Sequence, residues 1–132
     1  TLYISCFSES SLAAMDTTTE RITRRVSVGR SPKANDVLPG GRYVVTADYG
    51  GSGATLVDTR DWSAQRVDIP AMDHASGVVA ARRGLRFYVT GWYDGHLFSV
   101  GLEHDGPRYV VPRALQASVR AQRLFHDQHP AE

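Results

Sequence analysis

Residues that could bind a ligand or transfer a proton are concentrated near the ends of apolar stretches. They are Asp48, Tyr49, Asp73, His74, Trp92, Tyr93, Asp94 and His96. Aromatic rings stack on ligands, carboxylates and imidazoles form hydrogen bonds, and histidine is the commonest general base. Together these residues form the candidate ligand-binding site. His74 and His96 are the candidates for a catalytic base, which needs a histidine within hydrogen-bond reach of a substrate proton.

Other kinds of site lack the spacing that their chemistry requires. His74, His96 and His104 include no pair at the tight spacing of a zinc or iron motif, so no metal site is predicted. The sequence has no Gly-x-Ser-x-Gly nucleophile motif. The glycine-rich residues 50–53 lack the Lys-Ser/Thr that completes a phosphate loop. The single cysteine, Cys6, is expected to be a small buried apolar residue. No cofactor is predicted.

The composition is that of an ordinary globular chain. Of the 132 residues, 42% are hydrophobic and 22% charged, and the net charge is +1. This balance gives no reason to expect a nucleic-acid or acidic-membrane partner. No apolar run reaches the ~20 residues of a membrane span. The chain begins at Thr1 inside a strand pattern and carries no signal peptide, so it is expected to be processed or to be a fragment, and its compartment is undetermined.

The elements that must position the candidate residues are β-hairpins. Residues 86–92 alternate between two faces, Asp94-Gly95 supplies a tight turn, and residues 97–100 return. The same pattern recurs at residues 43–58 and 2–16. Ser5, Thr46 and Thr90 hold equivalent places, 41 and 44 residues apart. A period in the low forties is the length of a four-stranded propeller blade, roughly 40–45 residues.

The remaining segments complete this pattern. Residues 21–29, 63–70 and 108–112 are predicted outer strands, and residues 34–38 and 77–81 are predicted inner strands. The fold class is therefore all-β, a partial or half propeller of about three four-stranded antiparallel blades. Residues 1–29 form a partial blade, 30–70 and 71–112 form two further blades, and 113–132 form a C-terminal strand or helix and a tail.

The repeat resembles a known family. Tyr43-Val44-Val45-Thr46 and Tyr88-Val89-Thr90-Gly91 are similar to the YVTN strand of YncE-like β-propellers, and Met15-Asp16-Thr17 and Val28-Gly29-Arg30-Ser31-Pro32 are similar to its turns. The resemblance covers about residues 1–112, and the third copy lacks the Asp-Thr turn. It implies seven-bladed rings that are usually exported. Fewer than three blades cannot close a ring, since propellers have ~4–8.

Two functions are compatible with this pattern. The favoured one is a non-catalytic propeller module that binds a protein partner or small ligand. Binding would occur through its loop face, the surface of the loops that carry the candidate residues. The alternative is a propeller enzyme, a lyase or hydrolase, with a histidine base on that face. A third interpretation needs no site, because Trp92 and Tyr93 could pack between blades and Asp94-Gly95 could only form a turn.

The sequence also leads us to expect that the chain does not exist as a free monomer. The chain should pair with a second copy or belong to a longer propeller, because terminal blades expose an apolar face. The residues expected on these faces are Leu2, Ile4, Leu12, Met15, Phe87, Val89, Leu97, Phe98 and Val100.

Overall fold

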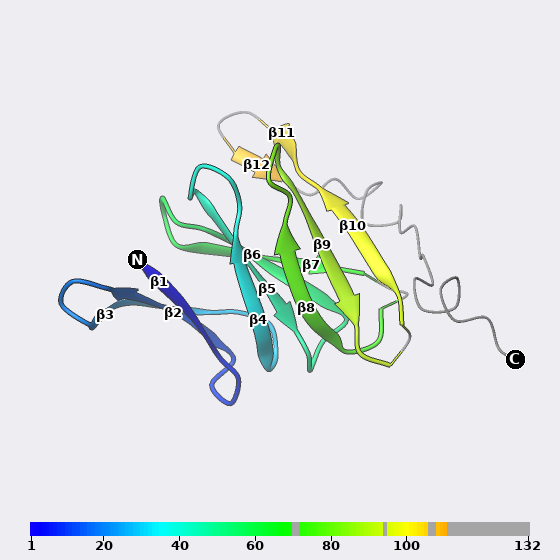
Figure 1. Ribbon diagram of the computed structural model, residues 1–132, viewed down its shortest axis with the longest axis horizontal. Coiled ribbons are helices and arrows are strands. Elements are labelled where there is room, and N and C mark those ends of the chain that lie inside the picture. The colour runs from blue at the N-terminus through cyan, green and yellow to red at the C-terminus, as the bar shows by residue number, and fades with distance from the viewer. Residues whose placement is uncertain (70–71, 94, 106–107, 111–132) are drawn as a thin grey trace, which may run out of the picture.

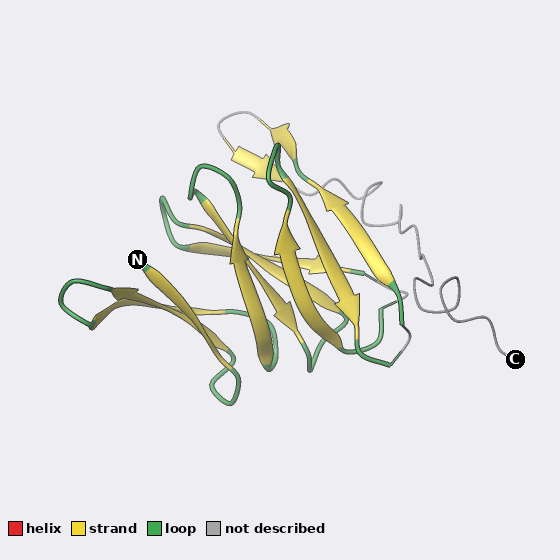
Figure 2. Cartoon of the chain, viewed as in Figure 1, coloured by secondary structure: helices red, strands yellow, loops and turns green. Residues whose placement is uncertain are grey.

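The structure is a computed structural model, and it describes residues 1–69, 72–93, 95–105 and 108–110. Regular structure within these residues is all β-strand, without a helix, as the alternating pattern predicted (Figure 2). The described residues therefore include no helix long and apolar enough to cross a membrane. Asp94, and the strand or helix predicted within 113–132, lie outside the described residues.

The strands form antiparallel sheets that follow one another along the chain and fan out in space (Figure 1). The first sheet comprises β1 (Leu2–Cys6), β2 (Ser11–Asp16) and β3 (Arg21–Ser27). The second comprises β4 (Pro32–Val37), β5 (Tyr43–Asp48), β6 (Gly53–Asp58) and β7 (Ser63–Asp68). The third comprises β8 (Ala75–Ala80), β9 (Arg86–Gly91) and β10 (Leu97–Gly101). Each sheet is an up-and-down meander, the arrangement of a propeller blade.

The second sheet is buried on both faces. Every residue of β5 and β6 is buried, whereas β7 is exposed along most of its length. Alternation explains the packing, since successive side chains of a strand point to opposite faces. Val45 and Leu56 pack toward the third sheet, and Val44 and Val57 pack toward the first. The sheet that carries Tyr49 is thus held from both sides.

Four large apolar residues of the third sheet point inward. Phe87, Val89, Phe98 and Val100 are at most 1% exposed and belong to the core shared with the second sheet. Leu12 is likewise buried, against Val44 and Val57. The expectation that these side chains form open faces is therefore wrong. Successive side chains of a strand point to opposite faces. In the third sheet, the face toward the second sheet carries the bulky apolar residues Phe87, Val89, Phe98 and Val100.

The outer strand predicted for the third repeat is not part of its sheet. Strand β12 (Arg108–Val110) pairs with β11 (Glu103–Asp105) in a separate hairpin. The turns before β3 and β7 explain the difference. Asp16 accepts hydrogen bonds from the N–H groups of Thr18 and Thr19, and Asp58 accepts one from that of Arg60. Gly101-Leu102 occupies that place in the third repeat and cannot form the same turn.

Two polar side chains of β4 join neighbouring sheets. Asn35 Nδ2 donates hydrogen bonds to the carbonyl of Tyr3, at 3.3 Å, and to Ser5 Oγ, at 2.8 Å. Asp36 Oδ2 accepts a hydrogen bond from the backbone N–H of Ala80, at 2.7 Å. The inner strand of the second sheet is therefore bonded to both adjacent sheets, which fixes their relative positions.

Candidate ligand-binding site

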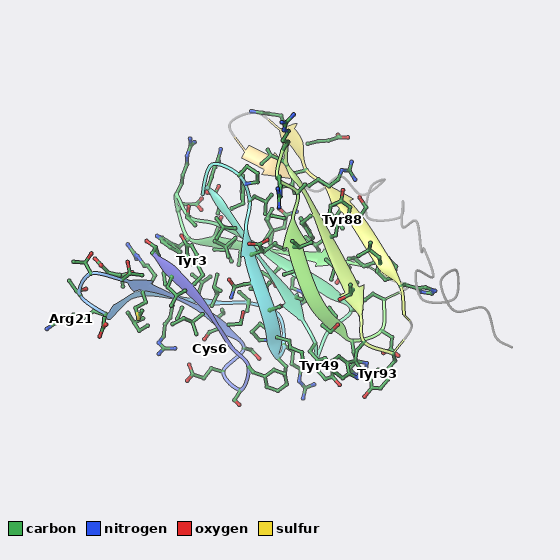
Figure 3. The ribbon with its side chains drawn as sticks, in the orientation of Figure 1. Tyr3, Cys6, Arg21, Tyr49, Tyr88 and Tyr93 are labelled. Atoms are coloured by element: carbon green, nitrogen blue, oxygen red, sulfur yellow. The ribbon has the colours of Figure 1, made fainter. Side chains whose placement is uncertain are left out.

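The loops that follow β1, β5 and β9 each begin with an aromatic residue. Phe7, Tyr49 and Trp92 occupy this place, at spacings of 42 and 43 residues. Each repeat thus brings one ring to the same end of the fan. Figure 3 shows Tyr49 next to Tyr93, the residue after Trp92, at this end. The blade repeat itself therefore builds an aromatic surface.

The rings contact one another across the three sheets. The ring centroid of Tyr49 lies 6.2 Å from that of Phe7, 6.3 Å from that of Trp92 and 4.8 Å from that of His74. The rings of His74 and Tyr93 are 5.0 Å apart and nearly perpendicular, at 83°. Such separations lie within the ~4.5–7 Å of favourable ring pairs. We call Phe7, Tyr49, His74, Trp92 and Tyr93 the aromatic cluster.

Much of this surface is open to solvent. The exposed fractions are 48% for Phe7, 54% for Trp92 and 65% for Tyr93. The hydroxyls of Tyr49 and Tyr93 are 3.4 Å apart. The rings therefore contact one another and still present free area, so burial between blades does not account for them.

One cation lies over the rings. Lys33 Nζ is 3.6 Å from the ring centroid of Trp92 and 4.9 Å from that of Tyr49. An ammonium within about 6 Å of a ring face is attracted by the ring's negative face. Lys33 is the only lysine in the chain, and it lies in β4, directly after the loop from the first sheet.

Asp73 and His74 form a hydrogen-bonded pair beside the rings. Asp73 Oδ1 contacts His74 Nδ1, which leaves the other ring nitrogen, Nε2, for a ligand. The backbone N–H of Trp92 donates to the carbonyls of Asp73, at 3.2 Å, and His74, at 2.8 Å. The left-handed backbone of His74, φ 52°, turns the chain into β8 at this point. The pair is thus tied to the end of β9.

A shallow pocket of about 190 Å³ opens between this pair and the loop after β5. Its lining residues are Tyr49, Gly50, Gly51, Ser52, Met72, Asp73 and His74. The two glycines leave room for cationic side chains: a Cβ on Gly50 would lie 2.7 Å from Arg30 Cγ, and one on Gly51 would lie 2.9 Å from an Arg66 nitrogen. Three of the predicted residues, Tyr49, Asp73 and His74, therefore share one pocket.

Asp48, another predicted site residue, is fully buried. Its carboxylate accepts hydrogen bonds from Thr46 Oγ1 and Thr55 Oγ1, both at 2.7 Å, and Arg66 Nη1 lies 3.2 Å away. The backbone N–H of Gly29 donates to Thr55 Oγ1, and a Cβ on Gly29 would collide with this ion pair. These contacts join β5, β6 and β7 to the connection between the first and second sheets, and the buried carboxylate of Asp48 is not part of the exposed aromatic cluster.

The pKa values of Asp48 and Tyr49 are both raised, for different reasons. Burial raises the pKa of Asp48, and the hydrogen bonds from Thr55 and Thr46 and the charge of Arg66 oppose this effect. The hydrogen bond to Tyr93 is the main cause of a raised pKa at Tyr49. Tyr49 therefore stays a neutral hydroxyl at physiological pH.

His96 lies apart from the pocket lining. Its ring contacts Phe98, with centroids 5.9 Å apart, and its carbonyl accepts a hydrogen bond from the N–H of Gly91. Among the predicted histidines, His74 alone lines the described pocket. Asp94, which follows Tyr93, lies outside the described residues.

A second hollow, of about 290 Å³, has a different character. Pro39, Arg42, Tyr43, Gly84 and Leu85 line it. The guanidinium of Arg42 donates two hydrogen bonds, at 3.3 and 3.0 Å, to the carboxylate of Asp58. This cation supports the turn into β7, so the hollow offers less for ligand recognition than the aromatic cluster does.

The candidate residues named from the sequence did not include Phe7 or Lys33. The regular spacing of Phe7, Tyr49 and Trp92 was the available signal for the cluster. No local signal places Lys33 on Trp92, because the two residues belong to different sheets. Met72 and Ser52 line the pocket and were also missed.

Comparison with solved structures shows the fold. Hydrazine synthase from Kuenenia stuttgartiensis matches with a TM-score of 0.68 and 20% identity over 92% of this chain and 34% of that chain. NirN, described as a dihydro-heme d1 dehydrogenase in complex with DHE, matches with a TM-score of 0.63 and 21% identity over 84% of this chain and 25% of that one.

Both proteins are of the β-propeller type, so the sheets described here are propeller blades. This chain spans about a third of the first and a quarter of the second. No protein-family model and no curated protein matches the sequence.

Proposed function

We propose that the chain is part of a YVTN-repeat, YncE-like propeller module that binds a small, ring-bearing molecule on the aromatic cluster without converting it. The observation that carries this proposal is the exposure of Trp92 and Tyr93, 54% and 65%, next to a polar pocket. Stacking rings with a few convergent polar groups is the usual composition of a small-molecule site.

Two further features support the proposal. The cluster uses residues from all three repeats, so a ligand there would contact more than one blade. The description of NirN as a dihydro-heme d1 dehydrogenase shows that a protein with this fold acts on a ring system. The shallow pocket of about 190 Å³ favours a ligand that lies partly on the exposed rings.

The test is a titration of the chain with 2-naphthalenemethanol, an uncharged two-ring probe, followed by calorimetry and tryptophan fluorescence. We expect Trp92→Ala to weaken binding about tenfold, because loss of a stacking ring removes ~1–3 kcal/mol. Trp62→Phe is the matched control, since Trp62 lies in the turn between β6 and β7. Equal affinity in the natural chain and both variants would refute this site, as would no binding.

The hydrogen bond between Asp73 and His74 favours a second candidate, a lyase or hydrolase with His74 as general base. A carboxylate on Nδ1 fixes the imidazole so that Nε2 can accept a proton. Hydrolysis of p-nitrophenyl acetate would reveal such a base. The rate should fall in His74→Gln and persist in His96→Gln, and equal rates in both variants would exclude it.

A further inference from the structure

We propose that the ligand of the aromatic cluster carries an anionic group, a carboxylate or phosphate, which Lys33 recognises. This inference rests on the ligand-binding function proposed above. The starting point is the position of the Lys33 ammonium, 3.6 Å from the ring centroid of Trp92 and 4.9 Å from that of Tyr49.

The ammonium is held in place by rings instead of by a carboxylate. None of the ion pairs found among the described residues involves Lys33. A cation–π contact orients the ammonium without neutralising its charge. Lys33 is also exposed, so its charge is accessible to a ligand.

The choice of lysine is informative in this chain. Every other strongly basic residue is arginine. An ammonium is a compact point charge with three donors, which fits over one ring and still bonds an anion beside it, whereas a guanidinium would cover the ring. The aromatic cluster thus combines a stacking surface with one positioned positive charge.

A second cation lies on the same side. Arg30 is exposed, and its side chain crosses Gly50 at the edge of the pocket. It too forms none of the ion pairs of the described residues. Arg30 lies in the connection between the first and second sheets, shortly before Lys33 at the start of β4. A ring stacked on Trp92 or Tyr93 would therefore meet positive charge toward the second sheet.

The experiment compares two probes with the same rings, 2-naphthoate and uncharged 2-naphthalenemethanol, by calorimetry. We expect the natural chain to bind naphthoate about three- to tenfold more tightly, as for a partly exposed charge pair. Lys33→Gln should lose this preference, and Lys33→Arg should keep part of it. Thr19→Gln, in the exposed turn before β3, is the control.

A second measurement does not depend on a variant. Reductive ¹³C-methylation labels only Lys33 and the amino terminus and preserves both charges. Naphthoate should shift the NMR signal of Lys33 and leave that of the terminus unchanged. Binding of both probes with equal affinity, or an unchanged Lys33 signal on saturation with naphthoate, would overturn the anion preference alone. Failure of both probes to bind would overturn the proposed function itself.

Discussion

At the scale of single residues, the end of β5 holds two neighbours with different tasks. Asp48 is buried and bonds to Thr46, Thr55 and Arg66, whereas Tyr49 joins the exposed cluster. The pleat explains this division, because adjacent side chains point in opposite directions. Asp48 joins strands of the second sheet, and Tyr49 lies among the rings of the aromatic cluster.

Asp48 should make stability depend on pH. Burial raises its pKa in the folded chain above the 3.8 of a free carboxyl, so the folded state holds the proton more tightly. Stability should therefore fall as the pH rises from about 4 through the folded pKa. We expect the natural chain to lose stability relative to Asp48→Asn as the pH rises above about 4. Urea unfolding at several pH values measures this difference.

The control for this experiment is Asp68→Asn, because the Asp68 side chain is 74% exposed and lies 3.9 Å from Arg66. Its difference from the natural chain should change little over the same range. The difference in free energy of unfolding between Asp48→Asn and the natural chain could instead be constant with pH, or could change in favour of the natural chain as the pH rises. Either result would contradict this prediction.

At the scale of elements, side chains join sheets that share no backbone ladder. Asp36 in β4 accepts the N–H of Ala80, the last residue of β8. Removing this acceptor in Asp36→Ala leaves a partly buried N–H without its partner, which costs ~1–3 kcal/mol. We expect chemical denaturation to show this loss, and Asp68→Ala to stay within about 0.5 kcal/mol of the natural chain.

An unchanged stability of Asp36→Ala would contradict this prediction. If Asp36→Ala unfolds at the same urea concentration as the natural chain, the packing of Phe87 and Val89 on the second sheet is sufficient to hold β8. The contact from Asp36 would then be incidental.

Strands and their recurrence could be predicted because their signals are local. Alternation in residues 43–48 and the Asp-Thr turns at Asp16 and Asp58 act within a few residues. Contacts between repeats carry no such signal. Two partners of Asp48, Thr55 and Arg66, lie on other strands, and the lysine over Trp92 comes from another sheet. The inward face of Phe87 depends on which neighbour packs there. The sequence thus indicated candidate residues such as Tyr49, Asp73 and His74, but it did not indicate the contacts among them.

At the scale of the molecule, the first sheet has an uncovered face. The register places Leu2 opposite Met15 and Met15 opposite Ile22, so the three side chains form a row across β1, β2 and β3. Leu2 is 48% exposed and Ile22 43%. The second sheet, by contrast, buries both of its faces. A blade is stable mainly through its neighbours, so this row is where another blade is needed.

We therefore expect the isolated chain to self-associate through the row of Leu2, Met15 and Ile22. Sedimentation velocity should give a mass above 14.5 kDa that rises with concentration. Ile22→Glu places a charge within the row and should shift the equilibrium toward monomer, because burying an unpaired charge is unfavourable. Thr19→Glu, in the exposed turn before β3, should leave association unchanged. A concentration-independent monomer of the natural chain that unfolds cooperatively would refute the prediction, since the row would then be tolerated in water. If association persists unchanged in Ile22→Glu, another surface of the blades must mediate it.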